Sequence, residues 1–167
     1  RQLNILAISV YLRYLETQGV TVEFPSAGYQ GDYITTLGQT LATQVGDALM
    51  LTQETLNAHL VQDTDETKDA HIDGLIANAK NALGDGFERP FQLALDAILT
   101  DIQDDLGEFG AHYDCWFSER SLVTDGAIDR AVDVLQEKGY LFTDKGALWF
   151  RSTTFGDDKD RVIRRDN

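Results

Sequence analysis

Apolar residues recur every three or four positions through most of the chain, which is the spacing of a helix that buries one face. This pattern predicts helices over residues 3–18, 32–46, 72–83, 90–106 and 124–138. Glycines follow most of these segments, at positions where a helix commonly ends. A break is predicted at Gly46, and Asp32 and Thr124 are predicted to cap the helices that they open.

Shorter aromatic and β-branched segments predict a small sheet. Residues 140–143 and 147–151 are predicted to form a β-hairpin, with Gly146 supplying the positive φ of its short loop. Residues 112–117 and 161–163 are predicted to be further strands, the last leading into a turn at Asp166 and Asn167. Three aromatic side chains are predicted to fill the core of this sheet: Trp116, Phe117 and Trp149.

Together these elements predict an α+β fold that is predominantly helical, with a small β-hairpin or sheet. No linker is visible, so residues 1–167 are predicted to form a single unit. The first helix begins at once, without an initiator methionine or a capping side chain in front of it. We therefore expect the chain to be a segment of a longer protein.

The charge of the chain limits its partners. It carries 28 acidic and 14 basic residues, a formal net charge of −14, which repels phosphate backbones and anionic membranes. Basic residues gather only near the C-terminus, where aspartates at 157, 158, 160 and 166 interrupt them: Arg151, Lys159, Arg161, Arg164 and Arg165. We expect this chain alone not to bind a nucleic acid. No run of about 18 apolar residues is present, so no membrane-spanning helix is expected.

Familiar catalytic and metal motifs are missing from the sequence. The single cysteine and the scattered histidines His59, His71 and His112 do not form a zinc pattern, so no metal site is expected. Residues 71–74 (His-Ile-Asp-Gly) resemble the ATP-binding signature of class I aminoacyl-tRNA synthetases. They lie inside a predicted amphipathic helix, and Asp73 would oppose a phosphate, so they are interpreted as ordinary helical residues.

Six longer blocks carry a more specific resemblance. They are RQLNILAISVYLRYLE (1–16), GYQGDYI (28–34), DDLGEFG (104–110), WFSERSL (116–122), GALWFRST (146–153) and FGDDKDRV (155–162). In this order they resemble bacterial arginyl-tRNA synthetases, and they are distributed from residue 1 to residue 162 of the chain.

The resemblance implies a cytoplasmic class I synthetase that activates arginine with ATP and transfers it to tRNA(Arg). The signature motifs of such enzymes, of the His-Ile-Gly-His and Lys-Met-Ser-Lys-Ser types, are both absent from this chain. What is present resembles the segment inserted into the catalytic domain, together with its two junctions. The parent protein is thus expected to be an arginine–tRNA ligase that binds arginine, ATP and tRNA(Arg), and the segment alone is expected to be inactive.

Few residues of the chain are expected near substrate. Gln2 follows the place where the family has an Asn-Asp-Ala-Gly turn near the active site, which makes it a candidate substrate-binding residue; a helix-surface glutamine is the alternative. The resemblance places the catalytic residues themselves outside this chain. Glu119 and Arg120 have catalytic side-chain types, but an ion pair or a helix cap also explains them. Tyr29 and Tyr33 either contact tRNA in the parent enzyme or pack against neighbouring residues.

A different class of function remains open at this point. A free-standing acidic helical module that binds other proteins, without catalysis, would explain the charge and the missing motifs equally well. It would not explain the six blocks.

Overall fold

The computed structural model describes residues 1–165 and divides into two compact units, Arg1–His112 and a second unit that begins at Tyr113. The sequence pattern predicted one unit without a linker, whereas the internal contacts of the structure separate after His112. The turn predicted at Asp166 and Asn167 lies outside the described residues.

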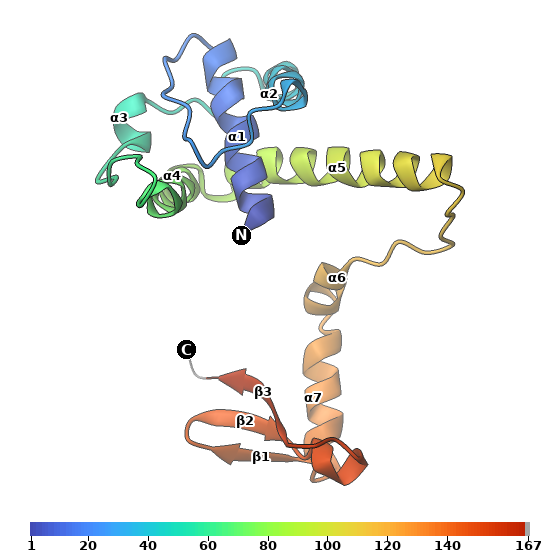
Figure 1. Ribbon diagram of the computed structural model, residues 1–167. Coiled ribbons are helices and arrows are strands. Elements are labelled where there is room, and N and C mark those ends of the chain that lie inside the picture. The colour runs from blue at the N-terminus through green and yellow to red at the C-terminus, as the bar shows by residue number, and fades with distance from the viewer. Residues whose placement is uncertain (166–167) are drawn as a thin grey trace. The chain divides into compact units, whose positions relative to one another are not determined.

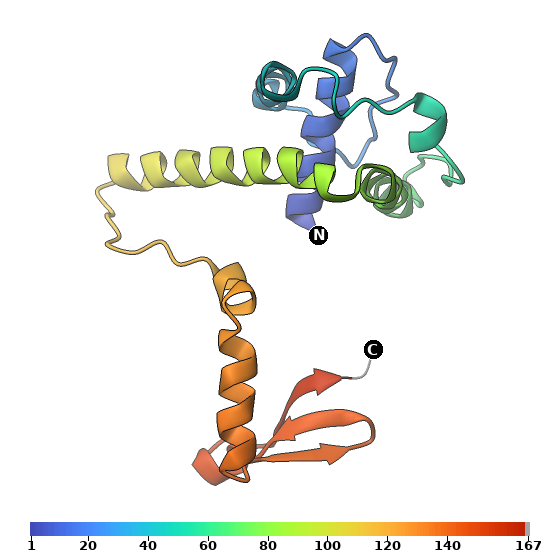
Figure 2. The same cartoon turned by 180° about the vertical axis from the view of Figure 1, so that it is seen from behind.

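The regular elements of the N-terminal unit are all helices, joined by loops. It contains α1 (Gln2–Thr17), α2 (Asp32–Val45), α3 (Gln53–Leu56), α4 (Lys68–Leu83), the 3-10 turn η1 (Gly84–Phe87) and α5 (Glu88–Glu108). Figures 1 and 2 show α1 crossing the first half of α5, while the second half of α5 continues beyond the other helices of the unit. The four helices predicted in this unit are confirmed, and α2 ends one residue before the predicted break at Gly46.

The central element of this unit is α1, which is buried on nearly all sides. Its buried side chains are Ile5, Leu6, Ala7, Ile8, Ser9, Val10, Tyr11, Leu12, Tyr14 and Leu15. A helix that is apolar around its whole circumference has to be surrounded by other elements, and α2, α4 and α5 pack against this one. The Tyr11 hydroxyl donates to the Leu49 carbonyl at 2.7 Å, and burial raises the pKa of Tyr11. The hydrogen bond and the packing of Tyr11 therefore attach the chain that follows α2 to α1.

Close packing of α1 against α2 depends on Gly38. A Cβ atom at this position would lie 2.6 Å from Cβ of Arg13 and 2.8 Å from the Arg13 carbonyl carbon and the Tyr14 amide nitrogen. Two of these three atoms belong to the α1 backbone, which a rotamer change does not move aside. The glycine therefore sets the distance at which the two helices cross.

The second unit contains two helices and a small sheet. Its elements are α6 (Glu119–Thr124), α7 (Ala127–Glu137), β1 (Leu141–Asp144), β2 (Ala147–Phe150), η2 (Ser152–Phe155) and β3 (Arg161–Arg165). The strands pair antiparallel in the order β1-β2-β3. Lys145 and Gly146 have φ of 49° and 72°, so the predicted hairpin is confirmed with a two-residue loop. The predicted α+β, mostly helical fold class is thereby confirmed.

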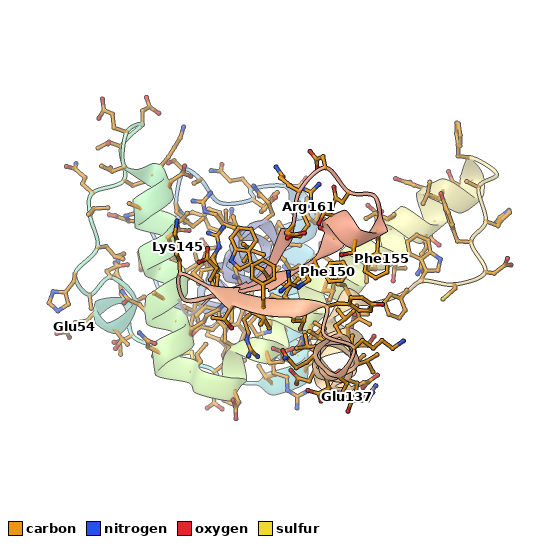
Figure 3. The ribbon with its side chains drawn as sticks, turned by 90° about the horizontal axis from the view of Figure 1, so that it is seen from below. Glu54, Glu137, Lys145, Phe150, Phe155 and Arg161 are labelled. Atoms are coloured by element: carbon orange, nitrogen blue, oxygen red, sulfur yellow. The ribbon has the colours of Figure 1, made fainter. Side chains whose placement is uncertain are left out.

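Little apolar surface is buried in this second unit. Leu141 is the one buried apolar side chain among its described residues. Phe155 lies against Phe150 (Figure 3), with ring centroids 5.6 Å apart. It also meets Tyr140 edge to face, yet 61% of Phe155 remains exposed. Aromatic contacts at the surface thus take the place that a closed core has in the first unit.

Residues 112–117 do not form the predicted strand. They have no regular secondary structure, and Trp116 and Phe117 are 44% and 67% exposed, so the prediction that they fill a sheet core was wrong. All three strands come from residues after 140, which leaves this segment without a partner strand in the described chain. Aromatic residues favour strands only where a pleated, half-buried surface receives them. Trp149 does lie in the sheet, half-buried and stacked on Phe142.

Both predicted helix caps were also wrong. Gly31 occupies the N-cap position of α2, and Asp32 is the first helical residue, where its charge favours the positive end of the helix. Thr124 ends α6 instead of opening α7, because Gly126 adopts a left-handed conformation (φ 67°) between the two helices. Within residues 1–165, no helix is both long and apolar enough to cross a bilayer.

Candidate functional site

Gln2, the candidate substrate-binding residue, lies in the first turn of α1 with its side chain exposed. Its Oε1 accepts a hydrogen bond of 2.9 Å from the hydroxyl of Tyr29. The structure therefore brings together two residues that the sequence singled out separately. Within the described part of the chain, the amide nitrogen of Gln2 has no hydrogen-bond partner, which leaves two N–H donors available to a ligand.

Ser9 is hydrogen-bonded to the backbone of Tyr29, whereas Gln2 is bonded to its side chain. The Ser9 hydroxyl is fully buried, donates to the Ile5 carbonyl at 2.7 Å and accepts the Tyr29 backbone N–H at 2.9 Å. Ser9 and Gln2 are seven residues apart, which is two helical turns and places them on one face of α1. One face of α1 thus forms hydrogen bonds with both the backbone and the side chain of Tyr29.

The loop that carries Tyr29, residues 24–31, is fixed at a second place. Ser26 donates its backbone N–H and its hydroxyl to the two oxygens of Asp63, at 2.7 and 2.6 Å. Between these anchors the chain turns sharply, with the Gly28 N–H bonded to the Pro25 carbonyl. A Cβ at Gly28 would lie 2.9 Å from the Phe24 ring and 3.1 Å from the Pro25 carbonyl oxygen, so a larger residue there would require the ring and the turn to shift. The segment 24–31, here called the Tyr29 loop, is therefore held between α1 and the chain before α4.

The bonds from Ser26 make the Tyr29 loop sensitive to acid. Hydrogen bonds from the Ser26 hydroxyl and backbone N–H lower the pKa of Asp63 below its ordinary value of 3.8. A carboxyl whose pKa is lowered by folding stabilises the folded loop above pH 3.8 and loses that contribution as the pH falls through its lowered value. We expect amides of residues 24–31 to lose hydrogen-exchange protection below about pH 4 relative to α1 amides.

The variant Asp63→Asn tests the same contact at neutral pH, because an amide oxygen is a weaker acceptor and carries no charge. It should expose the Tyr29 loop to exchange at pH 7 while leaving α1 protected. An unchanged protection pattern in this variant would contradict the proposed anchor. The exposed Asp65, which makes no bond to the loop, provides the matched control Asp65→Asn.

Next to Gln2, Arg1 forms ion pairs with α4. Its guanidinium lies 3.1 Å from a carboxylate oxygen of Asp69 and 3.1 Å from one of Asp73. Hydrogen bonds to Asp69 and Asp73 raise the pKa of Arg1. The two aspartates are one helical turn apart and share a face of α4, so they hold the start of α1 against this helix. Asp73 belongs to the tetrapeptide 71–74, which lies inside α4 as predicted.

Hollows are also present on the surface away from Gln2. One, of about 450 Å³, lies between α2 and α5 and is lined by Tyr33, Thr36, Leu37, Ala97, Ile98 and Asp101. Partial burial raises the pKa of Tyr33 there, with further contributions from its electrostatic interactions with Tyr29 and Asp101. Tyr33 thus lines an apolar hollow, and its hydroxyl makes no hydrogen bond to Gln2 in the described structure.

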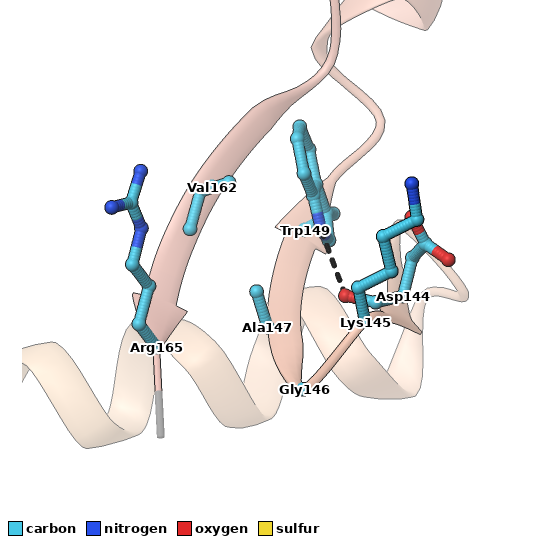
Figure 4. Close-up of a pocket in the computed structure, with 7 residues that line it drawn as sticks. All are labelled: Asp144, Lys145, Gly146, Ala147, Trp149, Val162 and Arg165. Atoms are coloured by element: carbon cyan, nitrogen blue, oxygen red, sulfur yellow. Dashed lines mark hydrogen bonds between the residues drawn. The ribbon is translucent and has the colours of Figure 1, made fainter. Parts of the chain in front are cut away.

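The second hollow, of about 520 Å³, lies on the sheet of the second unit (Figure 4). Trp149 and Val162 form its apolar wall, and Lys145 and Arg165 add positive charge. The indole N–H of Trp149 donates to the Asp144 carbonyl at 3.3 Å, which fixes the ring against the hairpin (Figure 4).

The basic residues near the C-terminus are partly neutralised. Arg161 contacts Asp157 at 2.6 Å and Asp158 at 2.9 Å, and this bonding lowers the pKa of Asp157. The Arg151 guanidinium lies over the Phe142 ring, 4.6 Å from its centroid. Glu119 and Arg120 are the first two residues of α6. Among the described residues no group of three metal-ligating side chains gathers.

Sequence reasoning missed both anchors of the Tyr29 loop. Ser9 carries a visible signal, because it is the one hydroxyl within the apolar run from Ile5 to Leu12 apart from that of Tyr11. A small polar residue at such a position has to find a partner once it is buried. Asp63 carries no such signal, because it lies in an acidic stretch in which every residue has the composition of a solvated loop.

Comparison with known proteins places this arrangement in context. No protein-family model matches the chain. Over its whole length it is 48% identical to the arginine–tRNA ligase of Psychrobacter cryohalolentis and 48% identical to that of Thioalkalivibrio sulfidiphilus. It is 49% identical to the ligase of Acidithiobacillus ferrooxidans. The chain spans about 29% of the length of the first two relatives and 28% of the third.

A solved structure agrees with these matches. A crystal structure from Campylobacter jejuni, assigned as an arginyl-tRNA synthetase, superposes on 99% of this chain with a TM-score of 0.57 and 25% identity. The chain covers 29% of that protein. The predicted resemblance to part of an arginyl-tRNA synthetase is confirmed.

Proposed function

We propose that this chain is part of an arginine–tRNA ligase, an enzyme that activates arginine with ATP and transfers it to tRNA(Arg) in the cytoplasm. The observation that carries the proposal is the match of the whole chain, at 48% identity, to 29% of a curated ligase. A free-standing interaction module gives no reason for such a match. The two compact units would then both belong to the inserted, connective part of the catalytic domain.

In this proposal the chain contributes positioning more than chemistry. Activation of arginine needs groups that stabilise the charge developing on the phosphates, and the residues expected to do so are outside this sequence. Gln2 is the residue that we propose to contact substrate. Support comes from its exposed amide nitrogen and from Tyr29, which occupies its oxygen. Free N–H donors suit the oxygens of a carboxylate or a phosphate.

We further propose that the tRNA is bound chiefly by other parts of the parent enzyme. The net charge of −14 opposes a polyanion, and Arg161 is already paired with Asp157 and Asp158. Affinity for nucleic acid depends mainly on cations that remain free to neutralise phosphates. On β3, Arg164 and Arg165 form no ion pair with a carboxylate in the described part of the chain, whereas Arg161 does.

A segment exchange tests the proposal directly. The matching 29% of the Psychrobacter cryohalolentis ligase is replaced by this chain, and arginyl-tRNA formation is measured with ATP, arginine and tRNA(Arg). We expect the chimera to be active. The isolated chain, assayed in parallel, should give no arginine-dependent pyrophosphate exchange and no saturable tRNA(Arg) binding at physiological salt.

Two controls make the result specific. A ligase from which the same segment is deleted should be inactive, which shows that the exchanged residues are needed. An inactive but folded chimera would argue against the proposed function. Exchange activity in the isolated chain above a heat-killed control would show that the chain contains catalytic groups of its own.

A further inference from the structure

We propose that Ser9 and Tyr29 are positioning residues that set the orientation of the Gln2 carboxamide, so that its NH2 group is presented to the substrate. This inference rests on the proposed function, in which Gln2 contacts substrate. The contacts that carry it form a continuous series from the Ile5 carbonyl through Ser9 and Tyr29 to the oxygen of Gln2.

The series begins at a buried and unusual residue. Ser9 is the one buried polar or charged side chain of the N-terminal unit, with no exposed surface. A buried hydroxyl costs free energy unless it is hydrogen-bonded, and Ser9 makes two bonds of normal length, 2.7 and 2.9 Å. Because its hydrogen is directed to the Ile5 carbonyl, a lone pair of Ser9 is left to receive the Tyr29 N–H. An alanine would fit the apolar surroundings of α1 but would leave that N–H without its acceptor.

Tyr29 then transmits this position to the surface. Its backbone is fixed by Ser9, and the turn at Gly28 directs the chain so that the phenol lies beside the start of α1. A phenol O–H that donates to a primary amide has to meet the oxygen of that amide. The bond of 2.9 Å therefore decides which end of the Gln2 carboxamide faces outward.

An exposed glutamine without such a bond samples many rotamers and turns its amide freely. Preorganisation removes part of the cost of binding, because the donors already point in the productive direction. The group recognised is an oxygen of an anion, either the carboxylate of arginine or a phosphate of ATP. The Michaelis constants of the two substrates distinguish these sources.

The test uses the active chimera with three variants: Tyr29→Phe, Gln2→Ala and the double variant. Tyr29→Phe keeps the ring and removes only the donor. We expect it to raise KM for either arginine or ATP by roughly three- to tenfold, the factor that one hydrogen bond contributes, with kcat changed less. The double variant should be no worse than Gln2→Ala alone, because Tyr29 acts through Gln2.

Two matched variants complete the set. Ser9→Ala should raise KM for the same substrate. Tyr113→Phe removes a phenol hydroxyl from an exposed tyrosine of the second unit and should change neither constant. Additive effects of Tyr29→Phe and Gln2→Ala, or an unchanged KM in Tyr29→Phe, would overturn the inference.

A measurement on the isolated chain separates this inference from the proposed function. The side-chain amide of Gln2 gives a pair of signals in a nitrogen–proton NMR spectrum. We expect Tyr29→Phe and Ser9→Ala to shift this pair and to bring it closer to the signals of freely exposed glutamines. If the wild-type pair already resembles those signals, the series of bonds is absent and the inference fails. An inactive chimera with a shifted Gln2 pair would instead contradict only the proposed function.

Discussion

Replacing Gly38 by alanine is expected to destabilise the N-terminal unit by about 1–3 kcal/mol, the range found when atoms are forced into a packed core. The added Cβ would lie 2.6–2.8 Å from atoms of Arg13 and Tyr14, two of them backbone atoms, so α1 and α2 have to separate. Alanine also favours the helix by up to about 1 kcal/mol, which offsets part of the loss.

Gly107→Ala provides the matched control. Gly107 also lies in a helix, but the nearest atom to its added Cβ is 3.8 Å away, on the His112 ring. The same substitution should therefore leave stability unchanged or raise it by up to about 1 kcal/mol. Urea unfolding measures both variants, as shifts of the midpoint at constant slope. Equal shifts of one sign would show that the helix crossing does not depend on Gly38.

Truncation of Tyr11 should have the larger effect on stability. Tyr11→Ala removes a fully buried aromatic ring from α1 and is expected to cost about 3–5 kcal/mol. Tyr11→Phe keeps the ring but leaves the Leu49 carbonyl without its donor, a cost of about 1–3 kcal/mol.

Phe109→Ala is the control for this pair, because Phe109 is 87% exposed and should change stability by no more than about 0.5 kcal/mol. Thermal and urea unfolding of the three variants give the comparison. If Tyr11→Ala lay as close to the wild type as Phe109→Ala, α1 would not be the core element that the structure describes.

The elements that sequence predicted well are those fixed by local patterning. The apolar repeat of α1 and α4, and the positive φ required at Gly46 and Gly84, are properties of neighbouring residues. The hairpin loop is local in the same sense, since Lys145 and Gly146 join strands that pair directly. Such features need no knowledge of distant contacts.

The predictions that were wrong concern features that depend on contacts or on a backbone path beyond the neighbouring residues. Residues 112–117 have strand-like composition, but a strand exists only where a partner lies beside it, and composition does not specify the partner. Thr124 has the side chain of a cap, yet the chain bends at Gly126 and places the helix start three residues later. In both cases a side-chain preference was outweighed by the path of the backbone.

In the candidate site, too, the sequence identified a single residue but not the long-range contacts that it makes. Resemblance to a family singled out Gln2, but not the contact that orients it. Tyr29 is 27 residues away in sequence and reaches Gln2 only because Ser9 and the Gly28 turn direct its loop. Asp63, which holds that loop from the other side, is a further 37 residues from Ser26. Contacts between residues so far apart in sequence can be identified only from the packed structure.

The burial of α1 has a consequence for how this sequence changes over evolutionary time. Between Ile5 and Leu15 only Arg13 is not buried, and its aliphatic stem touches the glycine that α2 presents. Nearly every mutation in this helix alters a packed volume or removes a partner of a buried polar group, so selection acts at each position. No residue of α7 is buried, so mutations there change the stability of the fold little and selection against them is weak. Orthologous sequences should therefore diverge slowly along the buried positions 5–15 of α1 and quickly along α7, at rates set chiefly by packing, since none of these positions is proposed to contact substrate.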